Sequence, residues 1–302
     1  MPAAGYSEKA GCLAWSFLCY KYIVFNGMKH ERSPTLKKLV NLVKSADEKF
    51  LGDFIKRFYS RCIKYRFSKV VNLDRHAGFP PARHAPGDSP LAYGGKVNSA
   101  TVLDAYGKGI FMHSLKYEPV LWWSPDPRSI ILPSQMHIEA SVKPYLKKYQ
   151  VTFDQSFRAV INGICDYWKD SREAWINEEI INAFCDLHEQ GYAHSAEVWH
   201  ENELVGGLYG LLLGNVFFIE SQFHLKNNAS KVAMIALSKL LQEIGVKICD
   251  TQYLTNFLKS MGAVEISRDE FLDYLEGPAV VSAALGKWTY RYSGASLVKT
   301  DK

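Results

Sequence analysis

The hydrophobic pattern of this 302-residue chain is most regular between residues 216 and 252. Residues 216–222 read VFFIESQ and residues 246–252 read VKICDTQ, and short apolar runs of this kind are typical of β-strands. Between them, apolar residues recur at helical spacing from Ala229 to Ile244, which predicts an amphipathic helix. The pattern therefore predicts a strand, a helix and a second strand in succession.

A helical connection of this length suits a crossover that returns the second strand parallel to the first. It would bring Glu220 and Asp250, which lie toward the ends of the two strands, into one cleft. Two carboxylates in one cleft repel, so each needs a cation, a hydrogen-bond donor or a raised pKa. Gln252 would lie on the same strand face as Asp250 and supply such a donor. The alternative is that both acidic residues face solvent as ordinary strand-end residues.

The elements around this unit follow from the same periodicity. We expect two helices, at residues 155–165 and 177–190, followed by three adjacent strands, at residues 193–200, 204–213 and 215–220. A meander, a crossover helix and a further strand predict the α+β fold class.

The first part of the chain differs from the rest in charge. Residues 28–70 contain twelve Lys or Arg against four Asp or Glu, a net charge of +8, whereas the whole chain has +5. We expect residues 1–75 to form a basic helical extension that attracts phosphate-rich partners; the alternative is a solvated helical face. The apolar run 13–25 is too short and too broken, at Lys21, for a membrane span and is a poor match to a secretory signal; the alternatives for it are a buried helix, a start upstream of the true start at Met28, and organelle targeting.

Composition excludes several other classes of protein. The chain is 47% hydrophobic and 22% charged, as is usual for a globular protein. Its six cysteines form no CxxC pair and no ligand-like spacing with histidine, which argues against a zinc module or a disulfide framework and favours a reducing compartment. We therefore expect a cytoplasmic protein without a metal site.

A series of short motifs carries more specific information. They are WWSPDPR at 122–128, EVW at 197–199, ELVGGLYG at 203–210, ES at 220–221, NASK at 228–231 and DTQ at 250–252. In this order they resemble the bacterial leucyl/phenylalanyl-tRNA-protein transferases. The resemblance runs from about residue 79 to 275 and does not cover the extension. Within the first motif Arg128 is a residue that could meet a phosphate, although tryptophans beside prolines are usually packing and turn residues.

The resemblance implies a fold and a reaction. It implies a small N-terminal domain at 76–133, an acetyltransferase-like (GNAT) domain at 134–290 and a tail at 291–302. Such an enzyme moves Leu, Phe or Met from aminoacyl-tRNA to the N-terminal amine of a protein that begins with Arg or Lys, which marks that protein for degradation in the N-degron pathway. No covalent nucleophile, metal or other cofactor is needed, because the ester is already activated.

The resemblance also implies roles for individual residues. Asp250 and Gln252 match the residues that the family places at the reacting amine, and Glu220 matches the one that helps to hold the acceptor. The donor site is matched by five residues, namely His113, Trp175, Leu208, Phe217 and Met234. The cationic patch for tRNA is matched by Lys143, Lys147 and Lys148. Apolar residues at strand or helix spacing are usually core, so Leu208, Phe217 and Met234 have an equally simple structural interpretation.

The chain departs from the family pattern at several positions. His113 stands where a tryptophan helps to hold the terminal adenosine, Ile219 where a glycine is usual, and Gln222 where a methionine is usual. Thr255 and Phe257 replace an asparagine and a histidine. These departures leave two alternatives open: a GNAT-like acyltransferase with another donor or acceptor, and a catalytically silent tRNA-binding relative.

Overall fold

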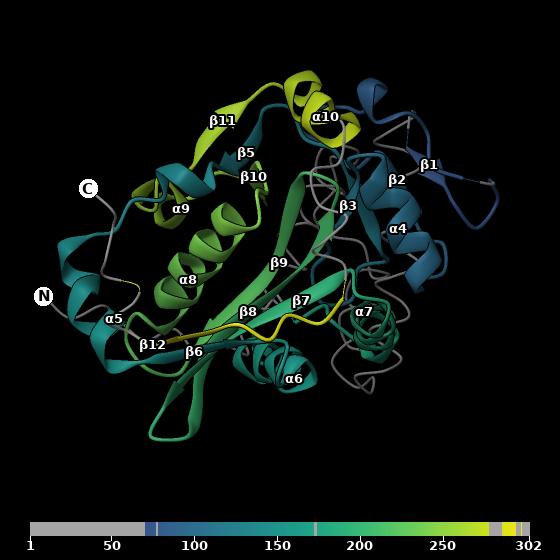
Figure 1. Ribbon diagram of the computed structural model, residues 1–302. Helices are drawn as coiled ribbons and strands as arrows, with labels where there is room; N and C mark the ends of the chain where they lie inside the picture. The colour runs from purple at the N-terminus through teal and green to yellow at the C-terminus, as the bar shows by residue number, and fades with distance from the viewer. Residues whose placement is uncertain (1–69, 77, 172–173, 278–285, 294–296, 298–302) are drawn as a thin grey trace, which may run out of the picture. The chain divides into compact units, whose positions relative to one another are not determined.

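The computed structural model describes residues 70–76, 78–171, 174–277, 286–293 and 297 (Figure 1). Most of the predicted basic extension, and all of the predicted tail beyond residue 293 except Leu297, lie outside these residues. Among the helices in the described ranges, none combines the length and the apolar character that crossing a membrane requires.

The first described part forms a small four-stranded sheet with the strand order β1-β2-β4-β3. Its strands are β1 (Val71–Asn72), β2 (Ala92–Tyr93), β3 (Phe111–Met112) and β4 (Leu121–Trp123). Helix α4 (Ser99–Gly107) lies between β2 and β3 and begins where the Asn98 side chain accepts a hydrogen bond from the Thr101 N–H at 2.9 Å. A short 3-10 helix, Ala82–His84, precedes β2.

The larger sheet has eight strands in the order β11-β5-β10-β9-β8-β7-β6-β12. Its strands are β5 (Arg128–Ile131), β6 (Gln150–Phe153), β7 (Ala193–His200), β8 (Glu203–Leu213), β9 (Val216–His224), β10 (Ile248–Gln252), β11 (Val264–Ile266) and β12 (Arg291–Ser293). Helix α8 (Ala229–Glu243) connects β9 to β10, and these two strands pair in parallel. The strand-helix-strand unit and the three-strand meander predicted from the sequence are confirmed.

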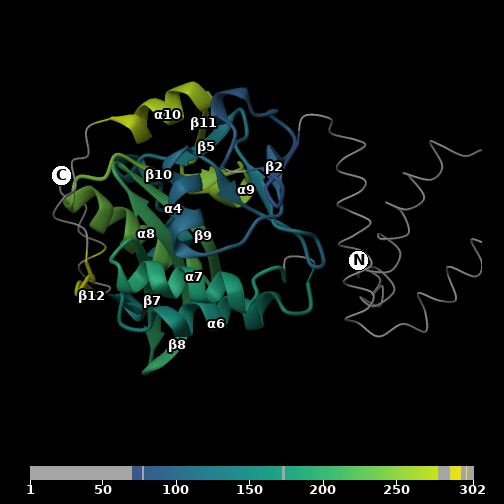
Figure 2. The same cartoon turned by 90° about the vertical axis from the view of Figure 1, so that its right-hand side faces the viewer.

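Helices cover both faces of this sheet (Figures 1 and 2). Helices α6 (Phe157–Trp168) and α7 (Glu178–Glu189) share a hydrophobic cluster with Tyr209 and Phe218, whereas α8 shares a second cluster with Leu208 and Phe217. Neighbouring residues of one strand thus face opposite sides, as strand geometry requires. The remaining helices are α5 (Lys143–Lys148), α9 (Asn256–Ser260), α10 (Arg268–Glu276) and the 3-10 turns Pro133–Gln135 and Ala140–Val142.

The fold belongs to the α+β class and has the GNAT-like order that the resemblance implied. Strand β6, helices α6 and α7, the antiparallel strands β7, β8 and β9, and then α8 and the parallel strand β10 follow one another along the chain. Strand β5, from the predicted N-terminal domain, and β12, from the predicted tail, also pair within the larger sheet. The predicted domain boundaries at residues 133 and 290 remain predictions.

Candidate active site

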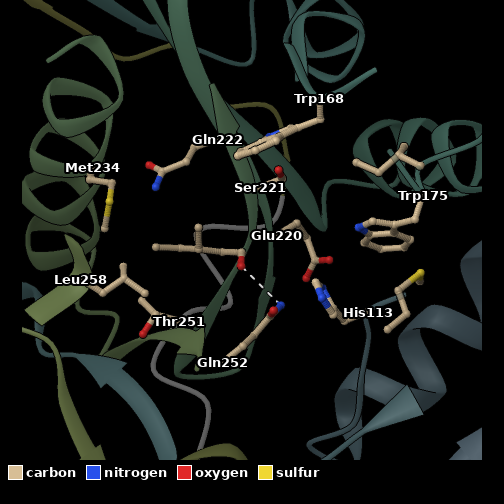
Figure 3. Close-up of a pocket in the computed structure, with 13 residues that line it drawn as sticks. His113, Trp168, Trp175, Glu220, Ser221, Gln222, Met234, Thr251, Gln252 and Leu258 are labelled. Carbon is tan, nitrogen blue, oxygen red and sulfur yellow. Dashed lines mark hydrogen bonds between the residues drawn. The ribbon is translucent and has the colours of Figure 1, made fainter. Parts of the chain in front are cut away.

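A cavity of about 460 Å³ opens where β9 and β10 part (Figure 3). The two strands pair from Val216 and Ile248 up to Phe218 and Asp250, and the residues that follow in each strand line the cavity. They are joined there by side chains from α8, from the segment after β3 and from the α6–α7 connection. The cavity therefore lies at the ends of two parallel strands, but Asp250, which was expected to share it with Glu220, is not among the residues that line it.

A β-bulge at Glu220 shapes one wall of the cavity. The register of β8 with β9 passes from Tyr209 opposite Ser221 to Gly210 opposite Ile219, which leaves Glu220 without a partner residue. A bulge interrupts the alternation of side chains between the two faces of a strand, and four consecutive residues of β9, Ile219–Gln222, consequently line the cavity.

Gly210 allows the strands to approach closely at this bulge. A Cβ atom at residue 210 would lie 2.1 Å from the carbonyl oxygen of Phe218 and 2.4 Å from the Phe217 ring. These distances are far below van der Waals contact, so a larger residue would push β8 away from β9. A glycine is required here because of packing, and the bulge depends on it.

Asp250 is held by Arg128, behind the cavity rather than in its wall. Both side chains are 0% exposed, and Arg128 donates from Nε to Oδ1 at 2.8 Å and from Nη2 to Oδ2 at 2.6 Å. The guanidinium also lies over the rings of Phe111 and Phe271, at 4.5 and 4.4 Å from their centroids. Asp250 therefore has the cation that a buried carboxylate needs. The suggestion that Arg128 meets a phosphate is wrong, since the guanidinium is buried against this carboxylate.

The buried pair positions Gln252. The Oδ1 atom of Asp250 accepts the backbone N–H of Gln252 at 2.9 Å, and Gln252 has a left-handed φ of 65°, which interrupts regular strand geometry. Its side chain lines the cavity, and Nε2 donates to the carbonyl oxygen of Ile219 at 3.4 Å, across the gap between β10 and β9. Of the predicted Asp-x-Gln motif, only the glutamine reaches the cavity.

Glu220 is the acidic side chain in the cavity wall. Its Oε1 atom is buried and has no hydrogen-bond partner. Burial raises its pKa from 4.5 to about 8, the charge of Asp250 adds to the rise, and the Tyr106 hydroxyl and Arg128 oppose it. The pKa of the buried Tyr106 hydroxyl is raised too, first by burial and then by Glu220. A carboxyl group of this kind exchanges its proton in the neutral to mildly basic range.

The predicted donor-site residues divide into two sets. His113, Trp175 and Met234 line the cavity, and the rings of His113 and Trp175 meet edge to face with centroids 5.9 Å apart. Leu208 and Phe217 are 0% exposed in the cluster under α8 and are not among the cavity-lining residues. For these two residues the structure favours the core interpretation.

The predicted tRNA-binding lysines lie away from the cavity wall. Lys143, Lys147 and Lys148 all belong to α5 and are exposed. Among the residues that depart from the family pattern, His113, Ile219 and Gln222 line the cavity. The Thr255 side chain accepts the Leu258 N–H at 3.2 Å and so begins α9. Phe257 lies under Lys231, whose Nζ is 5.9 Å from the ring centroid.

Several cavity-lining residues were not assigned a role from the sequence. They are Met112, Trp168, Ile176, Ser221, Thr251 and Leu258. Trp168 ends α6, so helical periodicity assigns it to that helix without showing that it reaches a cavity. Among residues in the described ranges, no group of three or more His, Cys, Asp or Glu side chains is placed to hold a metal ion.

Glu197 of the EVW motif stabilises the sheet and is not among the cavity-lining residues. It is 0% exposed and accepts hydrogen bonds from the hydroxyls of Thr152 and Ser195, each at 2.5 Å. Burial raises its pKa to about 7, and these two hydrogen bonds limit the rise. Because Thr152 lies in β6 and Ser195 in β7, the carboxyl group ties two neighbouring strands together.

Sequence comparison with known proteins finds relatives of one family. The profile of a family described as "Leucyl/phenylalanyl-tRNA protein transferase" matches residues 130–276. A protein of that name from Shewanella halifaxensis is 43% identical over 223 residues, which cover 72% of this chain and 94% of that protein. One from Pseudomonas putida is 45% identical over 202 residues, covering 65% and 89%. A GCN5-related N-acetyltransferase structure from Kribbella flavida aligns with a TM-score of 0.31 and 9% identity, covering 54% of this chain and 58% of that one.

Proposed function

The chain belongs to the leucyl/phenylalanyl-tRNA-protein transferase family, and on that premise we propose that it transfers Leu or Phe from aminoacyl-tRNA to the N-terminal amine of an acceptor protein. The observation that carries the proposal is that the Glu220 carboxyl group and the Gln252 amide line one cavity. A site that supplies a proton acceptor and a hydrogen-bond donor suits the attack of an amine on an ester.

The reaction is aminolysis. The neutral amine attacks the ester carbonyl carbon, the new C–N bond forms as the C–O bond to the tRNA 3′ oxygen breaks, and the proton lost by nitrogen ends on that oxygen. The ionised form of Glu220 accepts this proton, holds it well because its pKa is raised to about 8, and returns it to the leaving oxygen. Most of the remaining acceleration comes from holding the two substrates in one orientation.

Gln252 touches the reacting groups, and Asp250 acts through it. The Nε2 atom of Gln252 already spans the gap to Ile219, so it is placed to donate to a substrate oxygen in the same opening. Asp250 is fully buried and paired with Arg128, and it fixes the Gln252 backbone through the N–H bond. We therefore assign Asp250 a positioning role.

A basic first residue of the acceptor is favoured by the composition of the cavity. Glu220 provides a negative charge when it is ionised, and the indoles of Trp168 and Trp175 line the same space. Aromatic faces attract Lys and Arg side chains. Recognition of an N-terminal Arg or Lys would place the protein in the N-degron pathway of protein degradation, in the cytoplasm.

The aminoacyl-tRNA needs a cationic surface outside the cavity. The exposed lysines of α5, Lys143, Lys147 and Lys148, provide one, and phosphate contacts of this kind give salt-dependent affinity. His113 and Trp175 would hold the terminal adenosine by stacking.

The deciding experiment is transfer of radiolabelled Leu or Phe from charged tRNA to peptides that begin with Arg, Lys, Ala or Glu. We expect label on the Arg and Lys peptides only, a large loss of transfer in the Gln252→Ala and Glu220→Gln proteins, and normal transfer in a Gln190→Ala control, since Gln190 is exposed. Label on all four peptides would refute the basic-acceptor assignment. Binding of charged tRNA without any transfer would refute the enzymatic function and favour a silent tRNA-binding protein.

A further inference from the structure

Gln222 places an unpartnered polar atom in an otherwise apolar part of the cavity. Its Oε1 atom is buried and has no hydrogen-bond partner, although the residue lines the cavity. Figure 3 shows Gln222 between Met234 of α8 and Trp168 of α6, on the far side of the cavity from His113. Met234, which is 1% exposed, lines the cavity on the helix side of this end.

An unpartnered carbonyl oxygen in such surroundings favours ligands that donate a hydrogen bond to it. A buried acceptor without a hydrogen bond costs free energy, and a ligand whose donor group reaches the acceptor removes this cost. The other unpartnered cavity atom, Oε1 of Glu220, is the one assigned above to the acceptor amine. Gln222 then remains for the side chain of the residue being transferred, which Met234 and Leu258 would surround with apolar atoms.

We propose that Gln222 selects the transferred residue, and that the preferred side chain is apolar along its length and ends in a hydrogen-bond donor, as in tyrosine. Leucine and phenylalanine fill the apolar space but leave Oε1 of Gln222 without a partner. The inference rests on the proposed transferase function and concerns only the choice of donor. Sites built to hydrogen-bond a substrate hydroxyl discriminate strongly against the analogue that lacks it.

Tyrosine and phenylalanine form the matched pair for the test, because they differ by one hydroxyl group. Transfer from tyrosyl-tRNA and from phenylalanyl-tRNA to one Arg-initiated peptide would be compared as kcat/KM. We expect the wild-type protein to prefer tyrosine by roughly tenfold, the order of magnitude of one hydrogen bond to a partly open site. In Gln222→Met the preference should disappear, mainly because phenylalanine and leucine are used better.

Two controls separate the choice of donor from folding and from the acceptor. Gln190→Met changes an exposed glutamine at the end of α7 and should keep the wild-type ratio. Varying the first residue of the peptide, with the donor fixed, should leave the effect of Gln222→Met unchanged, whereas a change there would mean that Gln222 contacts the acceptor. The wild-type ratio tests the proposal without any substitution.

A binding measurement distinguishes failure of this inference from failure of the proposed function. Non-hydrolysable 3′-aminoacylamido adenosines carrying tyrosine or phenylalanine would be titrated into the full-length protein by calorimetry. Tighter binding of the tyrosine compound, lost in Gln222→Met, supports the inference even if no transfer occurs. Equal binding of both compounds, equal transfer of both residues, a preference unchanged in Gln222→Met, or no binding of either compound would overturn it.

Discussion

Replacement of Arg128 by methionine should destabilise the protein strongly, because it leaves a buried carboxylate without its cation. The Arg128 and Asp250 side chains are both 0% exposed and joined by two hydrogen bonds. Removing one partner of such a pair costs about 3–5 kcal/mol. For a folded unit of this size that corresponds to a fall in melting temperature of roughly 6–20 °C.

The measurement is urea denaturation of the wild type, Arg128→Met, Asp250→Asn and the double variant. We expect the double variant to be clearly less destabilised than the sum of the single changes, because neither buried charge remains. Arg83→Met is the matched control: Arg83 pairs with Asp269, but its side chain is 42% exposed, so solvent screens the pair and its loss should cost far less than the loss of Arg128.

The result that refutes this reasoning is specific. If Arg128→Met costs no more than Arg83→Met, or if the two changes at residues 128 and 250 simply add, then the buried pair is not what holds β5 and β10 together. At a temperature where Arg128→Met is still folded, its transfer rate should also fall, because Asp250 would no longer fix the Gln252 backbone.

Three further predictions follow from the geometry of the site. The raised pKa of Glu220, about 8 against an ordinary 4.5, means that the folded state binds this proton more tightly. Its stabilising effect is therefore complete below pH 4.5 and is lost as the pH rises through 8. Between pH 6 and 9 the wild type should lose more stability than Glu220→Gln in urea titrations, and parallel curves would contradict the buried position of Glu220. Gly210→Ala should lower the free energy of unfolding by about 1–3 kcal/mol and should lower the transfer rate, because the new Cβ would lie 2.1 Å from the Phe218 carbonyl oxygen. The control is Gly107→Ala, which should leave stability unchanged or raise it, because a Cβ there has nothing within 4 Å. Lys147→Ala with Lys148→Ala should reduce the slope of log affinity for tRNA against log salt by about one for each lysine, and an unchanged slope, as expected for Lys287→Ala, would place the tRNA elsewhere.

The pattern of apolar residues predicted the strands and helices well, because buried side chains recur along a strand or a helix with the period of that element. The strand-like segments within residues 193–222 and the helical spacing from Ala229 predicted β7, β8, β9 and α8. The parallel crossover also brought the ends of β9 and β10 together as expected, although the crossover predicted Glu220 and Asp250 in one cleft and the cavity is lined by Glu220 and Gln252. These features depend on neighbours within one strand-helix-strand unit.

Features that depend on distant partners were not predicted. Arg128 and Asp250 are 122 residues apart in the sequence, and nothing in WWSPDPR or DTQ indicates that they pair. Whether an apolar residue lies in the core or in a cavity wall also depends on which helix or strand packs against it. Leu208 lies in a strand and Met234 in a helix, and for both the sequence allowed either a core or a cavity position, but only Met234 reaches the opening. Asp250 and Gln252 were expected on one strand face, and the left-handed conformation of Gln252 cannot be read from residue type.

The bulge at Glu220 has a consequence for how this enzyme diverges from its relatives. The opening between β9 and β10 is set by backbone pairing and by one glycine, so side chains along its wall can be exchanged during evolution while the opening persists. Ile219 and Gln222 lie on this wall and are two of the positions where the chain differs from the family pattern. Exchanges at these two positions should therefore alter the lining of the cavity at little cost to folding.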